Sequence, residues 1–131
     1  MTAPSILGLT LDTGALLALD HPAKSVLMQA RLAEARRRGA TICVPAGAVA
    51  QAWRGPRQVR LARLIKSPDV DIAVMTLAVA RAVGSICAAT GHNDVVDVHV
   101  ALCARDRRHA VITSDPDDMA RIDPMLQLIH V

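Results

Sequence analysis

Short apolar runs alternate along the chain with longer segments in which apolar residues recur at helical spacing. Runs rich in Val, Ile and Leu are typical of strands, and three- to four-residue spacing is typical of helices. The predicted strands cover residues 6–11, 41–44, 70–74, 110–113 and 126–130. The predicted helical segments begin at residue 12 or 13 and then cover 24–38, 47–66, 77–89, 94–105 and 116–121. This alternation predicts one α/β domain over residues 1–131, with a mostly parallel central sheet of four to five strands covered by helices.

Composition narrows the kinds of protein that fit this pattern. The 131 residues are 52% hydrophobic, which is enough for one domain with a real core. No apolar run has the length of a membrane span, and no basic stretch precedes an apolar one at the N-terminus. We therefore expect no membrane segment and no secretory signal.

The cysteines and histidines indicate no soft-metal site. Cys43, Cys87 and Cys103 are scattered and include no Cys-x-x-Cys pair, so we expect a reducing, cytoplasmic environment without a disulfide framework. His99 and Cys103 are four residues apart on a predicted helix and could share a metal ion, but no third soft ligand is evident. A histidine packed beside a buried thiol is the favoured interpretation.

The positive charge of the chain resides almost entirely in arginine. The net charge is +3, and thirteen of the fifteen cationic residues are Arg, which suits bidentate contacts with phosphate. Four of them recur every three residues and would form a band winding around a helix: Arg54, Arg57, Arg60 and Arg63. The band is either a solvated helix face or a surface that guides RNA. Trp53 is the only aromatic residue, which argues against a stacking platform for single-stranded bases.

Acidic residues follow two of the predicted strands and begin one of the helices. Asp12 comes directly after the first strand, Asp115 after the fourth, and Asp94 and Asp97 open the helix predicted at 94–105. Ligands of parallel sheets bind at the carboxyl ends of the strands, so these acids are expected to meet at one edge. The alternative for Asp12, Asp94 and Asp115 is that each only caps a helix.

Asp97 is expected a full turn inside its helix, too deep to cap it. Two carboxylates about 4 Å apart repel each other by roughly 4 kcal/mol at an effective dielectric constant near 20, so converging acids require a counter-ion. A set of oxygen ligands suits Mg²⁺ or Mn²⁺. Such a site is typical of metal-assisted phosphoryl chemistry.

Three segments resemble the acidic motifs of PIN-domain ribonucleases. They read LDTGALLAL at 11–19, DVVDVHVA at 94–101 and TSDPDDM at 113–119. Their order and the chain length also match that family, and the chain is similar to the VapC-type toxins of bacterial toxin–antitoxin pairs. The resemblance implies a PIN-like α/β/α sandwich, Mg²⁺-dependent endoribonuclease activity, a cognate antitoxin and a homodimer.

The resemblance also implies roles for individual acids. Asp12, Asp97 and Asp115 would be the metal ligands, with Asp117 or Asp118 assisting Asp115 in the last motif. Asp94, one turn before Asp97, would act through water or as a supporting residue.

One position departs from the family pattern. The family has a Glu after the second strand, where this chain has Gln51. The only Glu, Glu34, lies in the earlier Arg-rich helix and cannot replace it. A glutamine can orient water through its amide but adds no negative charge. The alternative interpretation is therefore a weakened PIN-like module that binds RNA or protein without cleaving.

Overall fold

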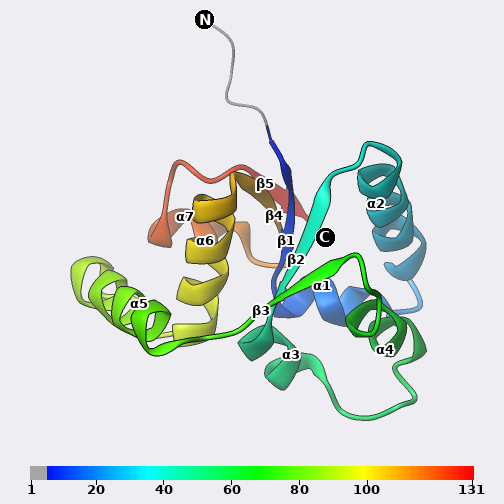
Figure 1. The fold of residues 1–131 in the computed structure, drawn as a ribbon, viewed down its shortest axis with the longest axis horizontal. Coiled ribbons are helices and arrows are strands. Elements are labelled where there is room, and N and C mark those ends of the chain that lie inside the picture. Colours follow the sequence, from blue (N-terminus) through cyan, green and yellow to red (C-terminus); the bar gives the residue numbers. More distant parts are fainter. Residues whose placement is uncertain (1–5) are drawn as a thin grey trace, which may run out of the picture.

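The computed structural model describes residues 6–131 and arranges them as a sheet between two layers of helices (Figure 1). Five strands form the sheet: β1 (Gly8–Leu11), β2 (Thr41–Pro45), β3 (Val70–Ala73), β4 (His109–Thr113) and β5 (Leu128–His130). Every neighbouring pair is parallel, and the strand order is β3-β2-β1-β4-β5. The prediction of an α/β fold around a mostly parallel sheet is confirmed.

Within residues 6–131, seven helices cover the sheet. On one side, as Figure 1 shows, lie α1 (Thr13–Ala18), α2 (Ser25–Arg37), α3 (Ala46–Ala52) and α4 (Val59–Ile65). On the other side lie α5 (Leu77–Thr90), α6 (Val95–Arg107) and α7 (Pro116–Ile122). None of these helices has the length and apolarity that crossing a bilayer would require.

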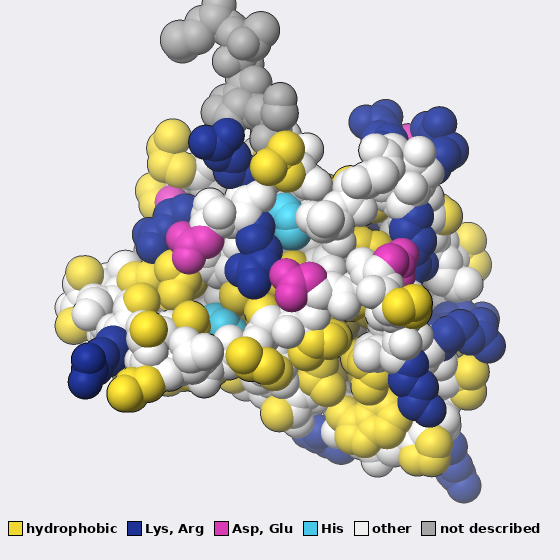
Figure 2. Space-filling view, viewed as in Figure 1, with side chains coloured by type: hydrophobic (Ala, Val, Ile, Leu, Met, Phe, Trp, Pro, Cys, Tyr) yellow, Lys and Arg dark blue, Asp and Glu magenta, His cyan; other side chains and the backbone are white. Residues whose placement is uncertain are grey.

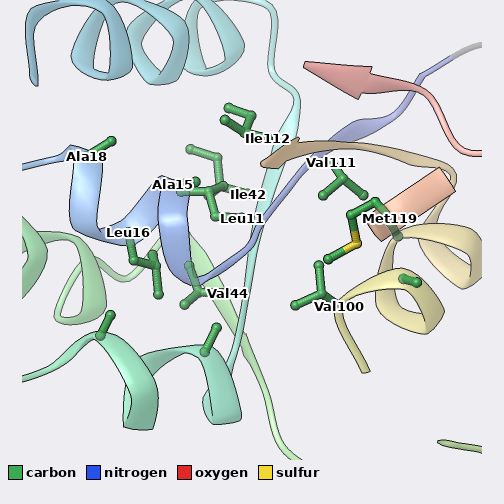
Figure 3. Packing of buried hydrophobic residues seen from close by; sticks show 14 of the residues in the cluster. Leu11, Ala15, Leu16, Ala18, Ile42, Val44, Val100, Val111, Ile112 and Met119 are labelled. Atoms are coloured by element: carbon green, nitrogen blue, oxygen red, sulfur yellow. The ribbon is translucent and has the colours of Figure 1, made fainter. Parts of the chain in front are cut away.

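Successive residues of the central strands point to opposite faces of the sheet. In β4, Val111 lies beside Val100 and Met119, whereas Ile112 lies on the side of Ile42 (Figure 3). All five side chains are essentially inaccessible to solvent. Parallel strands buried on both faces read as continuous apolar runs, which is why the short runs in the sequence identify them.

The arginine band does not wind around one helix, so that part of the prediction is wrong. The segment predicted at 47–66 is divided into α3 and α4 by a turn over residues 53–58. The Gln58 side chain holds this turn: its Oε1 accepts from the Arg54 amide at 2.6 Å, and its Nε2 donates to the Ala52 carbonyl at 2.9 Å. The bond to Gln58 occupies the Arg54 amide, which a continuous helix would pair internally. Pro56 has no N–H that could pair with the Ala52 carbonyl, so a continuous helix is disfavoured at this turn.

Two predicted strands are shorter than expected at their N-terminal ends. The strand predicted at 6–11 begins at Gly8, and the strand predicted at 126–130 begins at Leu128. Ahead of β1, the side chains of Ile6 and Leu7 are exposed. Ahead of β5, the apolar run continues because a side chain can pack against the core without its backbone joining the ladder. Leu126 illustrates this, since it packs against the main core from outside β5.

Gly8 allows a histidine to lie across the central strand. It pairs with Thr41 on one side and His109 on the other. The His109 ring hydrogen bonds through Nε2 to the Thr41 hydroxyl at 2.8 Å and through Nδ1 to the Thr10 hydroxyl at 3.0 Å. A Cβ atom at Gly8 would lie 2.1 Å from the Thr41 carbonyl oxygen and 2.6 Å from His109 Nε2. Only glycine therefore fits beneath this ring.

We predict that Gly8→Ala lowers the free energy of unfolding by about 2–3 kcal/mol, because the added methyl group forces the ring and the β2 backbone apart. The matched control is Gly84→Ala, where nothing lies within 4 Å of the added Cβ on α5. That change should be neutral or raise the free energy of unfolding by up to about 1 kcal/mol. Urea denaturation measures both, and equal stabilities for the two variants would contradict the steric argument.

Candidate acidic site

The strand order reverses at β1, and the region beyond the carboxyl ends of β1 and β4 is called the crevice below. From β1 the chain proceeds to β2 and β3 on one side, and later to β4 and β5 on the other. In open α/β sheets, ligands bind beyond the carboxyl ends of the two strands at such a switch point. Asp12 directly follows β1, and Asp115 lies two residues beyond the end of β4. Two of the predicted site residues therefore flank this crevice.

Asp12 is a buried carboxylate at the end of the central strand. It is 4% exposed and caps α1, with its Oδ1 accepting from the Ala15 amide at 2.8 Å. Burial raises the pKa of Asp12, and hydrogen bonds from the Thr113 hydroxyl and from backbone amides oppose this increase. The capping interpretation is thus confirmed for Asp12, but its burial exceeds what a cap requires.

Two glycines allow the surrounding elements to approach the crevice closely. A Cβ at Gly14, in the first turn of α1, would lie 1.9 Å from the Ser114 hydroxyl oxygen beyond β4. A Cβ at Gly47 would lie 3.3 Å from the Val96 side chain, where α3 meets α6. The close approach of α1 to Ser114, and of α3 to the start of α6, therefore depends on glycines at positions 14 and 47.

Asp94 caps α6, as the simpler interpretation of this residue predicted. Its Oδ1 accepts from the amides of Val96 at 3.0 Å and Asp97 at 3.1 Å. Because the helix begins at Val95, Asp97 is its third residue and lies in the first turn. The expectation that Asp97 lies a full turn beyond the helix start is wrong. The positive end of the helix dipole therefore favours its negative charge.

The pKa of Asp97 is raised to about 6 despite that dipole. Burial is the largest cause, followed by the negative charges of Asp94 and Asp12, with a smaller contribution from Asp118. His92 opposes the increase, and its Nε2 lies 3.9 Å from Asp97 Oδ2. The Asp97 carboxyl therefore experiences the charges of acids from three separate segments.

In the α7 segment, the charge of Asp118 acts on Asp97 more strongly than the charge of Asp115 does. Asp115 is exposed and caps α7, accepting from the Asp118 amide at 3.1 Å. Of the acids in this segment, Asp118 has the charge that acts most strongly on Asp97. Asp118 also accepts a bond from Arg121 at 2.8 Å. The structure thus separates a capping role for Asp115 from an electrostatic role for Asp118.

Gln51 lies on an exposed part of α3 and is connected to the crevice by a hydrogen bond. Its Oε1 accepts from the Thr13 hydroxyl at 2.7 Å, immediately after Asp12 in the chain. Glu34, in contrast, is paired with Arg37 at 2.6 Å and Arg38 at 2.8 Å on α2. As expected from the sequence, Glu34 does not substitute for a carboxylate at position 51.

Across residues 6–131, no three His, Cys, Asp or Glu side chains are arranged so that they could together hold a metal ion. Mg²⁺ does not require such a cage, because proteins usually hold it through one or two carboxylates and several waters. Asp12 and Asp97 fit that simpler arrangement, since the charge of one raises the pKa of the other and both provide only oxygen donors. The acids therefore fit a hydrated divalent cation bound through two carboxylates.

Sequence reasoning missed three polar residues of the crevice. His92 is the basic group nearest Asp97, Thr113 donates to Asp12, and Thr13 positions Gln51. Thr113 had a recognisable signal, because it opens the acidic segment TSD at the end of β4. His92 had none, since it lies in the loop between α5 and α6, and its contact with Asp97 depends on the conformation of that loop.

The predicted arginines lie on two neighbouring segments. Arg54 and Arg57 are in the turn at 53–58, and Arg60 and Arg63 are on α4. Arg60 and Arg63 line a groove of about 330 Å³ between α2 and α4, together with Arg36. Figure 2 shows Lys and Arg side chains along this side of the molecule.

Among the ion pairs of the described part of the chain, none involves the four arginines of the predicted band. Their charges therefore remain available to an anionic partner. A scan of protein-family models and a search of curated proteins both give no match to this chain. What the site can do thus follows from its chemistry: clustered carboxylates that suit a hard cation, and unpaired guanidinium groups that suit phosphate.

We predict that Asp97→Asn stabilises the metal-free protein at pH 7.5 by on the order of 1–2 kcal/mol. Because the pKa is about 6 in the folded state and usually 3.8, the cost of ionising Asp97 on folding begins above pH 3.8 and is complete above about pH 6. The stability difference should therefore shrink as the pH falls from 6 towards 4, where folded Asp97 carries a proton.

Thermal unfolding of the variant and of the unmodified protein, at pH 7.5 and at about pH 4, measures this stability difference. Asp106→Asn is the matched control, because Asp106 is an exposed acid on the same helix. If Asp97→Asn is less stable than the unmodified protein at pH 7.5, then Asp97 serves only the helix dipole, and the electrostatic description of the site is wrong.

Proposed function

We propose that this chain is a Mg²⁺-dependent endoribonuclease of the PIN type, with Mn²⁺ as an alternative ion. The observation that carries the proposal is the electrostatic coupling of Asp97 with Asp12 at the crevice where the strand order reverses. A carboxylate whose charge is disfavoured by its neighbours becomes favourable when a cation neutralises them. Binding of a cation would therefore offset the electrostatic repulsion among these acids.

Asp12 and Asp97 would hold the metal ion, which when bound would supply an activated water and neutralise charge on the phosphate. Asp94 fixes the first turn of α6 through two amide bonds and so orients Asp97. Asp118 would accept a proton from the attacking water, and Asp115 holds the start of α7. Gln51, fixed by Thr13, would orient water or substrate through its amide nitrogen, since its oxygen is engaged.

The substrate that this surface favours is RNA held through its backbone. Arg54, Arg57, Arg60 and Arg63 are exposed and would contact phosphates in a salt-dependent manner. Trp53 is half-buried and packs against the core, so it does not supply a stacking platform. Contacts of this kind carry affinity more than sequence discrimination.

The proposed context is the toxin component of a cytoplasmic type II toxin–antitoxin pair, acting as a homodimer and inhibited by a cognate antitoxin. This part rests on the resemblance of the three acidic motifs to those of VapC-type toxins. Exposed apolar side chains on α1 and α2 would suit a protein partner: Leu17, Val26 and Leu27.

A second candidate function is a PIN-like module that binds RNA or protein without cleaving. Gln51 favours it, because the amide at this position contributes no charge to metal binding. The same arginine surface would then retain RNA, and the acidic crevice would have no turnover. RNA binding without Mg²⁺-dependent cleavage would distinguish this module from the ribonuclease.

We predict that Asp97→Asn and Asp12→Asn each reduce Mg²⁺-dependent RNA cleavage at least about 100-fold, because each removes one of two carboxylates that would bind the ion. Incubation of total RNA with and without Mg²⁺ measures the activity. Asp106→Asn, on the solvent side of α6, should cleave as the unmodified protein does. Undiminished cleavage by Asp97→Asn would reject the proposed site.

We also predict that Gln51→Glu increases the apparent Mg²⁺ affinity by about threefold or more. The change adds a carboxylate beside the crevice and preserves an oxygen that can accept from the Thr13 hydroxyl. The Mg²⁺ concentration that gives half-maximal cleavage measures the effect. Gln127→Glu, a change of the same type at an exposed residue just before β5, is the control and should leave this concentration unchanged. A weaker Mg²⁺ response in Gln51→Glu would show that Gln51 is unrelated to the ion.

A further inference from the structure

Two buried cysteines meet on the sheet face opposite α2. Cys43 of β2 is fully buried, Cys103 of α6 is 3% exposed, and with Ala73 of β3 they form a cluster separate from the main core. Both are free cysteines, and the close approach of the two thiols within this cluster perturbs the pKa of each. Cys103 lies six residues, nearly two helical turns, beyond Asp97, so the pair is not part of the acidic site.

A small cavity reaches one of the two thiols. It has a volume of about 50 Å³ and lies between α5, α6 and the end of β3. Its lining includes Cys103, His99 and Arg107. A cavity of this volume admits a water or a molecule of similar size, such as hydrogen peroxide.

The polar groups around this cavity are not all satisfied. The His99 ring is 1% exposed, yet its Nδ1 has no hydrogen-bond partner among residues 6–131. A buried polar atom without a partner costs roughly 1–3 kcal/mol, so such atoms are uncommon and usually mark a bound molecule or a functional role. His99 lines the same cavity as Cys103, so a small polar molecule bound there would lie beside this ring.

The two thiols have unequal environments. The neighbouring Cys43 thiol lowers the pKa of Cys103, and His99 and the charge of Arg107 act in the same direction. The same contact and its burial raise the pKa of Cys43. Arg107 is held in place by Asp71 at 3.0 Å. Reactive cysteines are typically found beside such positive groups, whereas inert structural cysteines lack them.

We propose that Cys43 and Cys103 form a peroxide-sensitive dithiol, with Cys103 as the attacking thiol and Cys43 as the resolving one. The Cys103 thiolate attacks one oxygen of a hydroperoxide, the O–O bond breaks, and Cys103 becomes a sulfenic acid while hydroxide leaves. The Cys43 thiol then attacks the Cys103 sulfur and water leaves. The net reaction converts two thiols and one hydrogen peroxide into one disulfide and two waters. The product links β2 to α6.

The test compares the three cysteines in the folded full-length chain. Exposure alone predicts that the half-buried Cys87 reacts first, whereas the proposal predicts that Cys103 is oxidised at least about tenfold faster. Brief treatment with hydrogen peroxide should lower the intact mass by about 2 Da, and peptide mapping should identify a Cys43–Cys103 disulfide.

Variants separate the two roles. Cys43→Ser should trap the sulfenic acid at Cys103, which dimedone labels, and Cys103→Ser should leave Cys43 reduced. Cys87→Ser is the matched control and should behave as the unmodified protein. Circular dichroism verifies that each variant is folded. Preferential oxidation of Cys87, or an unreactive Cys103 in the folded unmodified protein, would overturn the proposal.

Discussion

Pairing of β1 on both sides is the constraint on which the rest of the molecule depends. Because its parallel neighbours β2 and β4 occupy both edges, each connection must cross a face of the sheet, and the strand order reverses at its carboxyl end. Gly8 permits the close pairing at the start of β1, and Asp12 follows its end. The same strand thereby supports the core and delivers a buried carboxylate to the crevice.

Most acids of the crevice also cap a helix. Asp12, Asp94 and Asp115 each cap a helix, so their hydrogen bonds offset part of the cost of placing negative charges together. Asp97 differs, because its raised pKa shows that burial and its neighbours disfavour its charge. A protein that keeps such a group sacrifices stability locally, which is typical of functional sites. With a cation bound, the negative charge of Asp97 would stabilise the folded protein instead of destabilising it.

The alternation of apolar runs was sufficient to predict the sheet and the edge at which Asp12 and Asp115 lie, because strand ends and acids are local features. The first turn of α6 was predicted less well, since one residue decides whether Asp97 lies inside it. The contacts of His92 with Asp97 and of Thr13 with Gln51 depend on loops and helix packing. Likewise, Cys43 and Cys103 meet only after β2 and α6 pack together. Such pairs carry no periodic signal in one sequence.

The most direct test of the central claim is the titration of the Asp97 carboxyl carbon by NMR, with and without Mg²⁺. An acid destabilised by its neighbours should titrate near pH 6 in the metal-free protein. Added Mg²⁺ should move its pKa below the usual 3.8, because the ion binds only the charged form. A pKa near 3.8 that does not change with Mg²⁺ would contradict the account, since Asp97 would then be neither strained by its neighbours nor in contact with a cation.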